Sequence, residues 1–274
     1  MLTTRSRSAR PSARLLASAA IVALLAASTA GCQTTQSTAS TGTVSLAPSD
    51  RSDADWQRDV QSYGAQYRAD PSNVQIAARY AQALRATGQR AQAVAILQEI
   101  SMRDPHNKVV LGEYGRALAD EGDYEQAMSV FDRAHTPEQP DWRILSAQGA
   151  VLDQMGRHEE AQHYYLTALK MAPNEPTVLS NLGLSYALSK DLKDAEATLR
   201  QAVAQQPVDP RVRQNLALVV GLQGRFAEAE TIARADLPPD QAAANVAYLR
   251  KMLARKGADM PIANRAAHYP AGSS

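Results

Sequence analysis

The sequence has 274 residues, of which 29 are Lys or Arg and 28 are Asp or Glu, so its formal net charge is +1. Its single cysteine excludes an internal disulfide and a cysteine-based zinc site. No cluster of basic residues follows Arg14, and because binding to a phosphate backbone depends on clustered Lys and Arg, the composition argues against a nucleic-acid partner.

Residues 1–31 have the pattern of an export signal. They carry four arginines and no acidic residue, followed by an apolar run of 13 residues from Leu15 to Ala27. A membrane-spanning helix needs about 20 apolar residues, so this shorter, Ala-rich run indicates a removable signal peptide rather than a retained anchor. Without this segment, 25 basic and 28 acidic residues remain, and the net charge becomes −3.

A candidate lipidation site follows the apolar run. The segment from Ser28 to Cys32 (STAGC) resembles the bacterial lipobox, in which small residues precede a cysteine that is lipidated and becomes the new N-terminus. The resemblance implies lipidation at Cys32. It also implies an anchor on the periplasmic face of the outer membrane, because Gln33 is not the Asp that signals inner-membrane retention. Thr29 stands where the lipobox usually has Leu, so the alternative is ordinary secretory cleavage after Ala30.

Residues 32–52 are expected to form a flexible tether between the lipid and the folded part of the chain. Ten of the twenty residues from 33 to 52 are Ser or Thr, and apolar clusters are almost absent. A random coil of this length reaches about 25 Å, which keeps the folded part close to the membrane.

A period of 34 residues runs through the rest of the chain. Two ladders carry it, one of glycines (Gly88, Gly122, Gly156 and Gly224) and one of alanines (Ala93, Ala127, Ala161, Ala195 and Ala229). They resemble tetratricopeptide repeats, whose 34-residue unit consists of two antiparallel helices. The resemblance implies an all-α fold, a right-handed superhelical α-solenoid with five repeats, at 74–107, 108–141, 142–175, 176–209 and 210 to about 243.

Two positions of the repeat are expected to interlock in the core. Position eight, in the middle of the first helix, is always small: Ala81, Gly115, Gly149, Gly183 and Ala217. Position 24, four residues after each ladder alanine on the second helix, is large in the first four repeats: Leu97, Phe131, Tyr165 and Leu199. Repeat five has only Ala233 there. The glycines at position 15 suit a left-handed helix end, and Lys190 replaces glycine in repeat four, which predicts a local weakness.

Both ends of the repeat array are irregular. Trp56, Val60, Tyr63 and Tyr67 share one helical face and precede Pro71, which predicts the second helix of an incomplete repeat. At the other end, Asp240 is expected to N-cap a capping helix with an apolar face of Ala242, Val246, Leu249 and Leu253. We expect a disordered tail at 257–274, which leaves 53–256 as the repeat domain.

The sequence contains no pattern that indicates catalysis. His158 and His163 are five residues apart, whereas the helical zinc-protease motif needs histidines four apart on one face. Ser185 lies in a Gly-Leu-Ser-Tyr-Ala stretch that lacks the final glycine of a nucleophile elbow and is expected in the middle of a helix. We therefore expect a protein without enzymatic activity, metal, cofactor or small-molecule substrate.

The repeat register predicts a partner-binding groove. In tetratricopeptide repeats, positions two, five, nine, twelve and thirteen of the first helix line the inner face. Repeats one to three place polar residues there, suited to hydrogen bonds with an extended peptide: Gln75, Gln82, Arg85, Arg116, Arg143 and Asp153. Repeats four and five place leucines there, suited to an amphipathic helix: Leu184, Leu188, Leu218 and Leu222. Alternatively, neighbouring repeats or the C-terminal helix cover these leucines.

The whole layout resembles the lipoprotein of the tight-adherence (Flp-type) pilus system, with the stretch from Leu237 to Arg250 (LPPDQAAANVAYLR) as the most specific signal. The resemblance implies a pilotin-like role, in which the protein binds the outer-membrane secretin, or another pilus or secretion component, and assists its assembly or localisation. The alternatives are an outer-membrane-protein assembly lipoprotein, a type IV pilus pilotin, and a periplasmic regulator of peptidoglycan enzymes. Such a regulator would lack a lipid and usually carries a coiled-coil segment.

Overall fold

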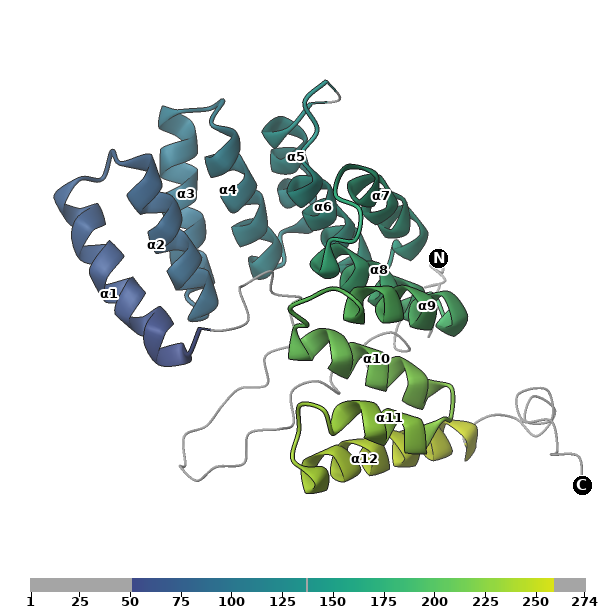
Figure 1. Ribbon diagram of the computed structural model, residues 1–274. Helices are drawn as coiled ribbons and strands as arrows, with labels where there is room; N and C mark the ends of the chain where they lie inside the picture. The colour runs from purple at the N-terminus through teal and green to yellow at the C-terminus, as the bar shows by residue number, and fades with distance from the viewer. Residues whose placement is uncertain (1–50, 137, 259–274) are drawn as a thin grey trace, which may run out of the picture. The chain divides into compact units, whose positions relative to one another are not determined.

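A computed structural model describes residues 51–136 and 138–258. The signal peptide, Cys32, most of the tether and residues 259–274 lie outside the described residues. Within the described ranges the chain forms twelve helices and no strand, which confirms the all-α solenoid (Figure 1). The helices are α1 (Asp53–Ala69), α2 (Val74–Ala86), α3 (Arg90–Arg103), α4 (Lys108–Glu121), α5 (Tyr124–Ala134), α6 (Trp142–Gln154), α7 (His158–Met171), α8 (Pro176–Leu188), α9 (Leu192–Val203), α10 (Pro210–Leu222), α11 (Phe226–Ala233) and α12 (Pro239–Ala258).

The predicted 34-residue period is the period of the helices. The first helices of the repeats, α2, α4, α6, α8 and α10, begin at 34-residue intervals, and so do the second helices, α3, α5, α7, α9 and α11. The residue before each first helix explains where it begins. Asn73, Asn107, Asp141 and Asp209 each accept hydrogen bonds from backbone amides of the first turn, and Glu175 is followed by Pro176, whose fixed φ suits a first helical position.

The small and large positions interlock as the sequence predicts. A Cβ atom added to Gly115 would lie 2.5 Å from the ring of Phe131, and one added to Gly149 would lie 2.7 Å from the ring of Tyr165. In repeat four, a Cβ on Gly183 would lie 2.6 Å from Leu199. These residues are buried, so each first helix can approach its second helix closely only because its notch is small.

The turns inside the repeats need a left-handed residue. The four ladder glycines at these turns have φ between +76° and +94°, a region that side chains with a Cβ disfavour. In repeat four the same turn is made by Lys190 with φ of 70°. The lysine therefore takes the glycine conformation at an energetic cost, as its place in the ladder indicates.

Successive repeats pack mainly through their first helices. Each first helix contacts the first helix of the next repeat, from α2 and α4 through α8 and α10, and α10 contacts α12 in the same way. Within the described ranges, the second helices show no equivalent packing against one another. The first helices thus form one continuous layer, and the residues on its free face are neighbours from repeat to repeat.

The two ends are closed differently. At the N-terminal end, α1 begins with a capping box at Ser52 and buries Trp56 beneath the guanidinium of Arg51, 4.0 Å from the ring centroid. At the other end, α12 begins at Pro239, so the prediction that Asp240 is the N-cap is wrong by position. Proline fits the first helical position, which leaves Asp240 inside the first turn. Ala242 and Leu249 are buried as expected.

Candidate protein-binding face

The ten residues predicted to line the groove lie on the first helices α2, α4, α6, α8 and α10. We call them the predicted binding face. Gln75 and Arg143 are exposed, and the other eight are half-buried. The shared layer of first helices therefore brings them onto a run of neighbouring helices, although they span 148 positions of the sequence, from 75 to 222.

The polar half of the predicted binding face is organised by a charge network. The Nε atom of Arg85 donates to Asp120 at 2.6 Å, and its Nη1 donates to Glu113 at 3.1 Å. Glu113 also accepts from Arg116 at 3.1 Å, so these two arginines share one carboxylate. The side chains of Arg85 and Arg116 are only 13 % and 15 % exposed. Burial lowers the pKa of Arg116, and Glu113 opposes this effect.

Glu113 and Asp120 were not among the residues predicted from the sequence. Their alignment with arginines one repeat away could have indicated them, because Asp120 lies 35 residues after Arg85 and 34-residue neighbours face each other. The network leaves little uncompensated charge, so this half is suited to hydrogen-bond recognition rather than to strong electrostatic attraction.

Asp153 is occupied inside the scaffold. Its carboxylate accepts hydrogen bonds from the Ser185 hydroxyl at 2.8 Å and the Tyr165 hydroxyl at 3.1 Å, and it pairs with His158 Nδ1 at 2.9 Å. Burial raises the pKa of Asp153, while these three partners act in the opposite direction. A partner protein would have to compete with the internal bonds to reach this side chain.

This cluster of Ser, His and Asp is not a catalytic triad. Ser185 donates to Asp153 directly, and its only contact with His158 is with the backbone carbonyl oxygen at 3.4 Å. In a triad, the serine hydroxyl would instead donate to the imidazole, which acts as the base. The cluster joins α6, α7 and α8 and is structural in the geometry that it adopts.

The apolar half of the predicted binding face is a strip of four leucines, which we call the leucine strip: Leu184 and Leu188 on α8, and Leu218 and Leu222 on α10. All four are half-buried, and they lie outside the hydrophobic clusters formed by the described buried residues. α8 and α10 pack against each other, so the strip is continuous across two repeats. Half-buried apolar side chains that do not belong to the core are typical of a contact surface.

The described part of the chain offers no other kind of site. In residues 51–136 and 138–258, no group of three His, Cys, Asp or Glu side chains is arranged to hold a metal ion. No helix in the same ranges combines the length and apolar character needed to cross a membrane.

Comparison with known proteins agrees with the repeat register. One family model described as Tetratricopeptide repeat matches residues 60–110 and 91–149, and a second with the same description matches residues 146–210 and 191–245. No curated protein matches the sequence.

Similar solved structures share the fold at low sequence identity. PilW, described as a widely conserved type IV pilus biogenesis factor, is 18% identical with a TM-score of 0.61, over 70% of this chain and 91% of PilW. The APC/C hetero-tetramer Cut9-Hcn1 is 15% identical with a TM-score of 0.57, over 79% and 44%. The human IFIT1 dimer with m7Gppp-AAAA is 17% identical with a TM-score of 0.56, over 65% and 45%. At such identities the likeness concerns the fold alone.

Proposed function

Because the chain belongs to the tetratricopeptide repeat family, whose members are protein-interaction scaffolds, we propose that it is an outer-membrane lipoprotein that binds a secretin. In this role it is pilotin-like and assists assembly or localisation of the secretin in tight-adherence pilus biogenesis. The lipobox-like segment ending at Cys32 and the stretch from Leu237 to Arg250 support the membrane and pilus parts of the proposal. The tetratricopeptide fold is typically non-catalytic, in keeping with a binding role.

The observation that carries the proposal is the leucine strip. Leu184 and Leu218 occupy the same position of adjacent repeats, 34 residues apart, and so do Leu188 and Leu222. On each helix the two leucines are four residues apart and therefore lie on one face. Two such pairs on packed helices form an apolar surface that fits the apolar face of a partner's amphipathic helix.

The polar half extends this binding mode. A partner whose helix lies on the leucine strip continues toward α6 and α4, where Arg143 and Arg116 lie. Arg116 donates to the backbone oxygen of Arg143 at 3.5 Å, so these two side chains are held near each other. We propose that the leucine strip supplies most of the affinity, and that the polar half fixes the direction of the bound segment through hydrogen bonds.

The decisive binding experiment replaces Leu184 and Leu218 with Glu and measures capture of the secretin's periplasmic and C-terminal segments by the purified protein. Loss of two apolar contacts of about 1.5 kcal/mol each, together with desolvation of two carboxylates, lowers the affinity at least about 100-fold. The matched control is Leu166→Glu, because Leu166 is a 44 % exposed leucine on a second helix, α7, away from the strip. Unchanged capture by a folded double variant contradicts the leucine strip as the binding site.

A cellular experiment tests the pilus assignment separately. Deletion of the gene is expected to abolish secretin multimers in outer-membrane fractions and to prevent tight-adherence piliation. Normal multimers and normal piliation would exclude this assignment while leaving the scaffold function intact. Loss of type IV pili instead would favour the type IV pilus pilotin, the alternative that the fold likeness to PilW supports.

A further inference from the structure

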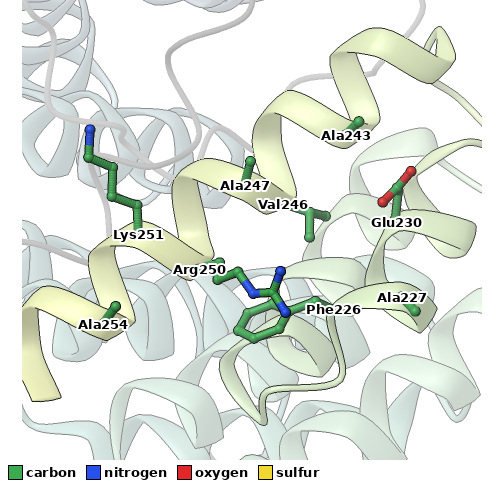
Figure 2. A pocket seen from close by; sticks show the side chains of 9 residues that line it. All are labelled: Phe226, Ala227, Glu230, Ala243, Val246, Ala247, Arg250, Lys251 and Ala254. Carbon is green, nitrogen blue, oxygen red and sulfur yellow. The ribbon is translucent and has the colours of Figure 1, made fainter.

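A hollow of about 570 Å³ lies at the C-terminal end of the repeat array, between α11 and α12. Its walls are mostly alanines and other apolar side chains, and the guanidinium of Arg250 lies 4.9 Å from the ring centroid of Phe226 (Figure 2). The lining residues are Phe226, Ala227, Glu230, Ala243, Val246, Ala247, Arg250, Lys251 and Ala254.

The repeat register explains why this hollow exists. Counting from Asp240 as position one, Ala242 and Leu249 occupy positions three and ten, the positions of the buried Val212 and Val219 in α10. α12 also contacts α10 and α11 as a first helix contacts the preceding repeat. It is therefore the first helix of a sixth repeat, displaced four residues from the strict period because repeat five is short.

In this register the hollow occupies the place of the missing second helix. Ala247 falls on position eight, which is small in all five repeats and receives position 24 of the second helix in repeats two to four. The contact of Gly115 with Phe131 and that of Gly149 with Tyr165 are examples. In α12 the equivalent notch opens into the hollow. An apolar slot shaped by the repeat geometry is thus left without a helix from the described residues.

The chain itself supplies a segment of the right length and pattern. Sixteen residues, 259–274, follow α12, whereas the second helices of the five repeats have 8 to 14 residues. Pro261 suits a first helical position, and Ile262, Ala266 and Tyr269 follow at the spacing of one helical face. The composition of this segment predicts no stable structure in isolation, but the slot provides the apolar partner that such a short helix needs.

We infer that residues 261–269 dock into the hollow as the second helix of a sixth repeat and close the C-terminal end of the solenoid. Second helices run antiparallel to their first helices, so a turn just after Ala258 brings Ala266 beside Ala254. The docked segment would cover Ala247 and Val246 as α1 covers the other end of the array. It would also prevent a second copy of the chain from stacking there. This inference does not depend on the secretin proposal.

Disulfide trapping tests the inference on the full chain, with Cys32→Ser to remove the native thiol. Cysteines replace Ala254 and Ala266 together, and mild oxidation is expected to give an intramolecular disulfide in most of the monomer. The matched control pairs Ala266→Cys with Tyr248→Cys, because Tyr248 is 53 % exposed on α12 but does not line the hollow. The docked geometry predicts at least about tenfold less trapping in this control pair.

Each other outcome overturns the inference. Equal trapping in the test and control pairs would mean that the tail samples all faces of α12. A disulfide that forms only between two molecules would assign the hollow to a second copy. As an independent measurement, deletion of residues 259–274 is expected to speed amide exchange in residues 247–254 about tenfold, and unchanged exchange would show that the segment does not cover α12.

Discussion

Replacement of Gly115 by alanine tests the notch packing that defines each repeat. The added Cβ would lie 2.5, 2.6 and 2.9 Å from three ring atoms of Phe131, a side chain with no exposed surface. Such overpacking costs about 3 kcal/mol, and the better helix propensity of alanine offsets about 1 kcal/mol of this. We expect Gly115→Ala to lower the free energy of unfolding by about 2 kcal/mol, measured by urea denaturation of the purified protein.

A second substitution identifies the cause. Repeat one carries Ala81 with Leu97 at the same two positions, so Phe131→Leu should partly relieve the strain of Gly115→Ala. The double variant is expected to be about 1 kcal/mol more stable than the sum of the single effects predicts. Strict additivity of the two changes would refute the notch explanation.

Gly88→Ala provides the control for that cycle. Gly88 has φ of +78° and nothing within 4 Å of an added Cβ, so its substitution costs about 1 kcal/mol through backbone strain alone. Its effect should add to that of Phe131→Leu without coupling, because the two sites share no contact of this kind. Coupling here as well would mean that the cycle reports a general loss of cooperativity.

Three further predictions concern the charge, turn and anchor features. Burial raises the pKa of Glu196, but hydrogen bonds from Arg225 and Arg200 outweigh it and lower that pKa from 4.5 to about 2. Because the folded pKa is the lower one, about 2 kcal/mol of stability, allowing for solvent screening, is present above pH 4.5 and lost between 4.5 and 2; Glu196→Gln should flatten this part of the stability curve. Lys190→Gly should stabilise the protein by about 1 kcal/mol in thermal unfolding, since glycine adopts φ of 70° without strain. Cys32→Ser should move the protein from the membrane to the soluble fraction and abolish fatty-acid labelling; labelling that persists would place the lipid elsewhere.

The sequence predicted the repeats well because their signals are local and recur. Position eight is small in all five repeats, and the turn glycines recur at a fixed distance, so five weak signals reinforce one another. The N-caps of the first helices follow the same period, from Asn73 to Asp209. A single Gly or Asn would have decided nothing, but the period made each of them informative.

The features that the sequence did not predict depend on three-dimensional neighbours. Whether Arg85 faces solvent or Glu113 is decided by the rotation between two first helices, which no residue pattern states. Asp153 was assigned to the binding face by position, yet its carboxylate turns toward Ser185 of the next repeat. The displaced register of α12 follows from the short α11, whose eight residues could not be counted before its end was known.

The bonds that Asp153 makes have a mechanical consequence. A solenoid of nearest-neighbour units can unzip from either end, one repeat at a time, because few contacts skip a repeat. The carboxylate of Asp153 in repeat three receives Ser185 from repeat four, so these two repeats cannot separate without leaving a buried charge unpaired. Fraying that starts at α1 or at α12 should therefore stall at the middle of the array, where α6, α7 and α8 act as a clasp.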